Sequence, residues 1–202
     1  LAAQAVEHGV YILSDEIYEK LVYDGAEHHS IAACSPEAKE LSIVVNGVSK
    51  AYSMTGWRIG YTGANEEIIA GMNKVQSQEV SHPSSISQKA AVEALDGPQD
   101  SVEVMRRAFD ERRRYMVERL NALEGVECSL PQGAFYAYPD VTAYYGRRAG
   151  GRTIESSVLL CEYLLEEAKV ACVPGAGFGT HDHIRLSYAT SMELIEVAMD
   201  RI

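Results

Sequence analysis

The sequence lacks Cys-X-X-Cys pairs, long apolar runs and a surplus of positive charge. None of its four cysteines (Cys34, Cys128, Cys161 and Cys172) has a second cysteine at the spacing of a redox or metal motif. No apolar stretch approaches the roughly 20 residues that cross a bilayer. The 29 acidic residues outnumber 18 basic ones, and a net charge of -11 repels a phosphate backbone. These absences weigh against a membrane span and against nucleic-acid binding, and they favour a reducing compartment, with the cytoplasm expected.

What the sequence does contain is a large apolar content and an unusual start. Hydrophobic residues make up 47% of the 202 residues, enough for one large or two small domains. The opening segment, Leu1 to Gly9, has the pattern of a helix end stopped by glycine, without an initial methionine or a signal-peptide pattern. We therefore expect the sequence to begin within a domain.

In the first half, strand-like runs lead into a helical segment. Strands are predicted at residues 10–13, 43–45 and 58–64, and a helix at 66–77. Alternating strands and helices predict an α/β fold with a parallel sheet, whose ligands bind at the carboxyl ends of the strands. Asp15 and Lys50 follow the first two strands, so we expect both to face a ligand.

The second half is helical at first and then mixed. Helices are predicted at 84–95, 100–123, 154–168 and from Ser191, and strands at 126–129, 135–138, 170–173 and 184–187. The 100–123 helix has an amphipathic pattern, and its arginine-rich face is predicted to be solvated. The Gly- and Arg-rich loop 142–152 is expected to be the least ordered. We place a smaller α+β domain at residues 105–202, after a first domain part at 1–104.

Lys50 carries the strongest chemical signal. A lone lysine after a strand is usually a solvated surface group, but this one has a hydroxyl beside it in Ser49 and a guanidinium eight residues on in Arg58. A lysine near other cations and removed from water has a lowered pKa, which favours imine chemistry with an aldehyde. The arginine fork suits a phosphate dianion.

Asp15 and Arg185 each allow two interpretations. Asp15 could be an ordinary turn cap, or its carboxylate could point into one pocket with the phenol of Tyr18. Arg185 stands between apolar residues of a predicted strand, where a charge needs a partner. That partner could be an internal carboxylate or the carboxylate of a substrate.

Five segments, taken in order, carry a family resemblance: residues 14–19 (SDEIYE), 50–61, 132–136 (QGAFY), 173–179 and 184–188 (IRLSY). They closely resemble the fold type I, pyridoxal-phosphate-dependent aminotransferases of class I and II, and most of all the bacterial aspartate aminotransferase branch. The resemblance implies that residues 1–104 are the C-terminal part of a large, mainly parallel-sheet cofactor-binding domain. Residues 105–202 would be the small C-terminal domain.

The resemblance also implies roles around pyridoxal 5'-phosphate. Lys50 would bind the cofactor through its amine and then move a proton between the substrate Cα and the cofactor C4′. Asp15 would pair with the protonated pyridine nitrogen, and Tyr18 would donate to the phenolic oxygen. Arg58 would bind the phosphate, with Ser49 as a weaker candidate.

The activity implied is amino transfer between an L-amino acid, of aspartate type, and a 2-oxo acid in a two-stage ping-pong cycle. Arg185 would hold the substrate α-carboxylate in a bidentate fork. A homodimer with a shared active site is implied as well. The family keeps its phosphate-binding turn and the residues that read the substrate side chain in a front half with no counterpart here. We therefore expect this chain to be the C-terminal half of a longer subunit.

Two other functions use the same residues. A carbon–sulfur β-lyase, or an aminotransferase with aromatic or alanine preference, would share the fold and all of the residues named above. An aminotransferase-like effector domain of a transcriptional regulator would bind the cofactor and turn over slowly.

The remaining motifs have plain explanations. His181 and His183 form an HxH pair without a further ligand at metal spacing, so no metal site is expected. The adjacent His28 and His29 are expected at the surface. The glycine-rich run 175–179 lacks GxGxxG spacing and is interpreted as a loop.

Overall fold

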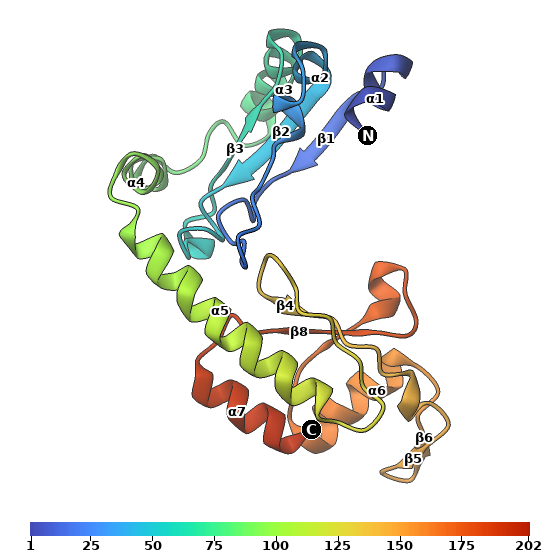
Figure 1. Cartoon of the computed structure of the whole chain (residues 1–202). Coiled ribbons are helices and arrows are strands. Elements are labelled where there is room, and N and C mark those ends of the chain that lie inside the picture. Colours follow the sequence, from blue (N-terminus) through green and yellow to red (C-terminus); the bar gives the residue numbers. More distant parts are fainter. The chain divides into compact units, whose positions relative to one another are not determined.

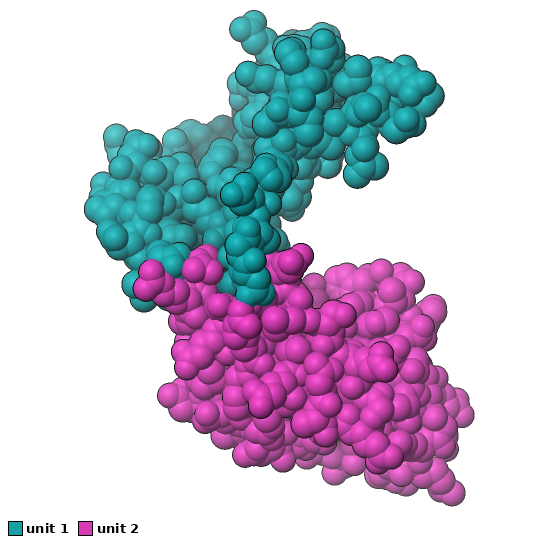
Figure 2. All heavy atoms as spheres, viewed as in Figure 1, with its two compact units in different colours: residues 1–104 teal, residues 105–202 magenta.

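The computed structural model describes all residues, 1–202, and its strands form two three-stranded sheets and one two-stranded ribbon (Figure 1). The chain divides into two units, Leu1–Val104 and Met105–Ile202, coloured separately in Figure 2. The boundary falls inside helix α5 (Asp100–Asn121), so the connection between the units is helical. No helix of the chain combines the length and the hydropathy that a bilayer span requires.

The first unit contains one sheet and its helices. Its elements are α1 (Ala2–His8), β1 (Ile12–Asp15), α2 (Pro36–Leu41), β2 (Ser42–Gly47), β3 (Gly60–Gly63), α3 (Glu66–Glu79) and α4 (Ser85–Asp96). Helix α1 ends as predicted at Gly9, which adopts the left-handed conformation (φ 62) that glycine tolerates without a Cβ penalty.

The sheet of the first unit is only partly parallel. Strand β1 pairs with β2 in parallel, from Ile12 opposite Ser42, and it starts two residues later than predicted because β2 offers no partner before Ser42. Strand β3 runs antiparallel to β2, with Gly60 opposite Gly47. The expectation that all three strands are parallel was therefore wrong for β3. The connection 48–59 turns back at the same end of the sheet without a crossover helix, and an antiparallel neighbour follows from that.

The second unit is built around an antiparallel sheet with the order β4-β8-β7. Its elements after α5 are β4 (Tyr136–Ala137), β5 (Arg148–Ala149), β6 (Arg152–Thr153), α6 (Ser157–Tyr163), β7 (Val173–Pro174), β8 (Ile184–Ser187) and α7 (Met192–Arg201). The core combines Phe109, Met116 and Leu120 of α5 with Ile184 and Leu186 of β8, all less than a tenth exposed. The amphipathic pattern of α5 is therefore a true core face.

Three predictions for the second unit need correction. The strand at 126–129 is reduced to an isolated bridge between Glu127 and Asp140, because the Asn121 side chain takes both the N–H and the C=O of Cys128. The loop 142–152 is ordered as a one-turn 3-10 helix and the β5–β6 ribbon. The strand at 170–173 begins only at Val173.

The arginine-rich face of α5 is not wholly solvated. Arg113 is fully buried, and its guanidinium donates to Asp110 Oδ1 at 2.5 and 2.9 Å and to the Pro131 carbonyl at 2.5 Å. A buried charge persists only when it is paired and hydrogen-bonded, and these contacts meet that condition. The arginine therefore fastens α5 to the segment that leads into β4.

Candidate active site

The polar residues of the first unit gather where β1 and β2 end. The two strands are parallel and in register, with Asp15 opposite Val45. Asp15 is the last residue of β1, and Lys50 lies three residues beyond the end of β2. Carboxyl ends of parallel strands meet at one edge of a sheet, so the fold brings these two residues to the same edge.

Lys50 sits in a tight turn that two buried neighbours anchor. Val48 and Ala51 are 0% and 2% exposed, whereas Ser49 and Lys50 are half-buried. The N–H of Ser53 donates to the Lys50 carbonyl at 3.3 Å, which closes the turn. Burial of the flanking side chains fixes the backbone of the turn, while Ser49 and Lys50 themselves stay partly accessible.

Arg58 returns to the same edge because β3 runs back along β2. Gly60, the first residue of β3, lies opposite Gly47, the last residue of β2. Arg58 comes two residues earlier, has a left-handed backbone (φ 53), and donates from Nη1 to the Thr55 carbonyl at 2.6 Å. Its side chain is exposed. The left-handed conformation is uncommon for a residue with a Cβ, and here it marks the point at which the chain turns into β3.

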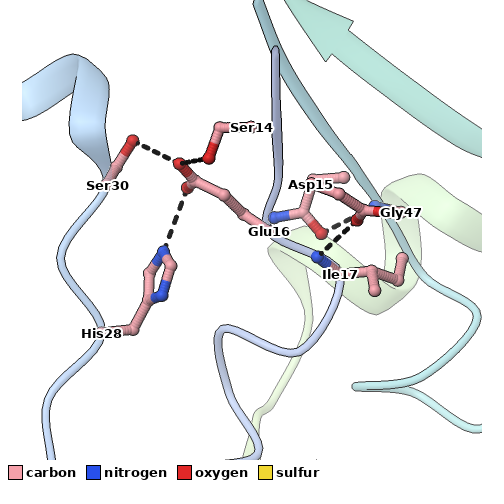
Figure 3. Close-up of polar contacts among 8 residues, drawn as sticks. Ser14, Asp15, Glu16, Ile17, His28, Ser30 and Gly47 are labelled. Carbon is pink, nitrogen blue, oxygen red and sulfur yellow. Dashed lines mark hydrogen bonds and ion pairs between the residues drawn. The ribbon is translucent and has the colours of Figure 1, made fainter. Parts of the chain in front are cut away.

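Asp15 acts as a turn cap, the first of the two interpretations that its sequence context allows. Its Oδ1 accepts the N–H of Ile17 at 3.2 Å, the contact of a turn cap (Figure 3). The carboxylate is nevertheless exposed at the strand end, and the turn it caps contains the half-buried Tyr18. A cap of this kind fixes the direction of the carboxylate without removing it from the surface.

Arg185 lies in the second unit, at the centre of β8. Its neighbours Ile184 and Leu186 are buried, and the alternation of a strand directs Arg185 to the other face of the sheet. None of the ion pairs found in this chain includes it. Its guanidinium carbon lies 4.4 Å from the ring centroids of both Tyr136 and Phe178.

A buried carboxylate beside Asp15 was missed by sequence reasoning. The Glu16 side chain, 5% exposed, accepts hydrogen bonds from Ser30 Oγ at 2.8 Å and Ser14 Oγ at 3.1 Å, and it contacts His28 Nε2 at 3.0 Å (Figure 3). His28 and His29 both lie at the surface, as expected, and His28 reaches Glu16 from there with 31% of its side chain exposed. The network ties the end of β1 to the segment 28–30.

The alternation of side chains along β1 could have predicted this network. Successive strand residues face opposite sides, so Asp15 and Glu16 could not both reach solvent on one face. Glu19 lies near enough to Glu16 and His28 for one donor atom of each to fall within 4.8 Å of the others. Glu16 already has three hydrogen-bond partners in Ser14, Ser30 and His28.

The Glu16 network gives a prediction for stability against pH. Burial raises the pKa of Glu16, but the hydrogen bonds from His28, Ser30 and Ser14 outweigh it and hold the pKa below its ordinary value of 4.5. A lowered folded-state pKa stabilises the fold above the unfolded value, and this contribution is lost as the pH falls through the folded-state pKa. We expect Glu16→Gln to lower the free energy of unfolding at pH 7 by about 1 to 3 kcal/mol.

Urea unfolding between pH 7 and pH 3 measures this effect, on protein expressed with all the sequence that its gene encodes. The difference between Glu16→Gln and the unaltered protein should shrink as the pH falls below 4.5. The control is Glu27→Gln, whose carboxylate is 80% exposed and which should change little. A difference that stays constant from pH 7 to pH 3 would contradict the prediction.

Comparison with known proteins places this arrangement in a family. The family model of aminotransferase class I and II matches residues 1–202. The chain is 50% identical over all 202 residues to an aspartate aminotransferase of Geobacillus stearothermophilus and spans half the length of that protein. The crystal structure of the Rhizobium meliloti aspartate aminotransferase superposes with a TM-score of 0.93 at 44% identity, over 100% of this chain and 52% of that one.

The aromatic aminotransferase of Pyrococcus horikoshii superposes with a TM-score of 0.89 at 40% identity, over 99% of this chain and 52% of the other. This chain thus spans about half the length of the relatives that it matches. Both sequence and fold agree over the whole chain, and the α/β fold expected from the sequence is that of part of an aminotransferase. The chain belongs to the aminotransferase class I and II family.

Proposed function

We propose that the protein carrying this chain is a pyridoxal-phosphate-dependent aminotransferase. It would move an amino group between an L-amino acid, aspartate in the first place, and a 2-oxo acid in a ping-pong cycle. The observation that carries the proposal is that Asp15 and Lys50 lie at the neighbouring carboxyl ends of two parallel strands. Family membership and the names of the aspartate aminotransferase relatives support it.

The donor set at this edge fits the chemistry of pyridoxal phosphate. The half-buried amine of Lys50 matches an aldehyde, and the exposed carboxylate of Asp15 matches a protonated ring nitrogen. The guanidinium of Arg58 and the hydroxyl of Ser49 match a phosphate dianion, and the phenol of Tyr18 matches the phenolic oxygen. Each functional group of the cofactor therefore has a complementary side chain in the first unit.

The chain's own residues would then divide the reaction between them. When bound, the cofactor supplies an electron sink for the substrate carbon that loses its proton. Lys50 would take the proton from the substrate Cα and deliver it at the cofactor C4′. Asp15 would keep the ring nitrogen protonated, and Arg185 would orient the substrate by its α-carboxylate. The two stages use the same groups in reverse order, as a ping-pong cycle requires.

We further propose that the two units are the C-terminal part of the large cofactor-binding domain and the small domain of this family. The active assembly would be a homodimer with a shared active site. The four free cysteines are compatible with the cytoplasm as its compartment.

The proposal is tested by product analysis on the protein with its cofactor. Incubation with aspartate and 2-oxoglutarate should yield oxaloacetate and glutamate in equal amounts. Pyruvate and ammonia from a β-substituted amino acid, without glutamate, would point to a β-lyase instead. Cofactor binding without measurable turnover of any amino acid would favour the regulator.

An aromatic donor is the second candidate, because a structural relative at 40% identity is named an aromatic aminotransferase. The same assay with phenylalanine or tyrosine in place of aspartate ranks the two by kcat/KM. A higher kcat/KM for the aromatic donor would replace aspartate as the preferred substrate and leave the reaction class unchanged.

A further inference from the structure

Arg185 is held by aromatic rings and by no acceptor of the chain. Its guanidinium carbon lies 4.4 Å from the Tyr136 ring centroid and 4.4 Å from the Phe178 ring centroid. Both distances are within the roughly 6 Å at which a cation is attracted to an aromatic face. Tyr136 belongs to β4, next to β8 in the sheet, whereas Phe178 comes from the turn that follows β7.

We propose that Tyr136 and Phe178 form an aromatic clamp that positions Arg185 for carboxylate ligands. The inference rests on the proposed function, in which Arg185 binds the substrate α-carboxylate, and it adds two positioning residues to that role. Contact with two rings restrains a long, flexible side chain and replaces water around the delocalised cation. A guanidinium restrained before the ligand arrives loses less conformational freedom on binding.

The N–H groups of Arg185 remain available for such a ligand. No hydrogen bond or ion pair of this chain engages them, although the residue is partly buried. Arg113 shows the opposite case, because Asp110 and Pro131 use its N–H groups. Arg185 therefore combines a restrained cation with uncommitted donors, which is the condition for bidentate carboxylate binding.

The turn that carries Phe178 is tightly built. Gly175 donates its N–H to the His183 carbonyl at 2.8 Å, and a Cβ at this position would lie 2.4 Å from the same oxygen. Thr180 donates its N–H to the Gly175 carbonyl at 3.1 Å and contacts the Tyr138 hydroxyl with its own at 2.5 Å. These contacts fix both ends of the turn and so fix the ring of Phe178.

A second aromatic contact supports Phe178 from the side. The Tyr138 ring meets Phe178 edge to face at a centroid distance of 6.3 Å. Phe178 is nevertheless 50% exposed, so its ring is not a core residue whose loss would unfold the unit. An exposed aromatic side chain that is held in this way is suited to act on its neighbour Arg185.

The test uses the protein with its cofactor, as expressed from the complete gene, with maleate as a dicarboxylate probe. Phe178→Leu should raise the dissociation constant of maleate and the KM for amino acids by about threefold to thirtyfold. The kcat value and the cofactor content should change much less, because the proposed role of the rings is to position Arg185 for binding. Phe178→Tyr keeps an aromatic face and should restore affinity close to that of the unaltered protein.

Tyr136→Leu and Tyr136→Phe form the second pair of variants. Tyr136→Leu, which loses the ring, should weaken maleate binding and raise KM, and Tyr136→Phe, which keeps it, should not. Unchanged maleate affinity and KM in both leucine variants, while the unaltered protein transaminates, would overturn the clamp and leave the proposed function intact. The clamp would also be overturned if Phe178→Tyr and Tyr136→Phe lost as much maleate affinity as the two leucine variants. If the unaltered protein neither transaminates nor binds maleate, the proposed function fails and the clamp fails with it.

Discussion

Replacing Lys50 with alanine is expected to lower the rate of transamination by a factor of about 10⁴ or more. The proposed role of its amine is twofold, because it both binds the cofactor aldehyde and moves the proton of the substrate. The fold should persist, since the buried neighbours Val48 and Ala51 that anchor the turn are untouched.

Two measurements check this expectation. Steady-state assays give the loss of activity, and borohydride reduction with peptide mass mapping shows which lysine carries the cofactor. The label should be found on the Lys50 peptide of the unaltered protein and on no peptide of the variant. Lys39→Ala, at an exposed lysine near the end of α2, is the matched control and should leave both results unchanged. Normal turnover by Lys50→Ala, or labelling of another lysine, would remove Lys50 from the site.

Replacing Arg185 with leucine is expected to lower kcat/KM for amino acids by about a hundredfold or more, because a bidentate, charge-assisted contact with the α-carboxylate would be lost. Arg185 is not a core residue, and leucine keeps an apolar side chain at this strand position, so the loss should not come from unfolding. Arg185→Lys keeps the charge but not the planar guanidinium, so its kcat/KM should lie between the values of Arg185→Leu and of the unaltered protein.

Maleate binding and steady-state kinetics measure the effect of Arg185→Leu, and cofactor absorbance serves as an internal check that the rest of the site is intact. Arg201→Leu, at an exposed arginine at the end of α7, controls for the change in net charge. If Arg185→Leu bound maleate and amino acids as tightly as the unaltered protein, Arg185 would not be the carboxylate site.

Much of the fold could be predicted because local patterns determine it. The glycine stop of α1, the apolar period of α5 and the cap of α7 at Ser191 each act within a few residues. The direction of β3 depends instead on how the segment 48–59 turns back. The missing strand at 126–129 depends on Asn121, whose side-chain bonds to Cys128 replace a strand ladder. Contacts of this range leave no periodic signal in the sequence.

For the candidate site, the sequence predicted where Asp15 and Lys50 lie, at the ends of neighbouring strands, and their roles stay predictions. The two residues were singled out because ligands bind at strand ends in sheets of this kind. The partners of Arg185 could not, since Tyr136 and Phe178 come from β4 and from the turn after β7 and meet it only in the folded sheet. Glu16 was overlooked because a carboxylate next to the exposed Asp15 is expected to be exposed as well, whereas its side chain is buried.

The tight turn at Gly175 restricts which substitutions this position can accept. No side chain fits between its Cα and the His183 carbonyl, although its backbone angles are open to other residues. A substitution there would push the turn outward and carry the Phe178 ring away from Arg185, without touching either residue. Sequences that keep this clamp should therefore have glycine at position 175, whereas the exposed residues around it should vary.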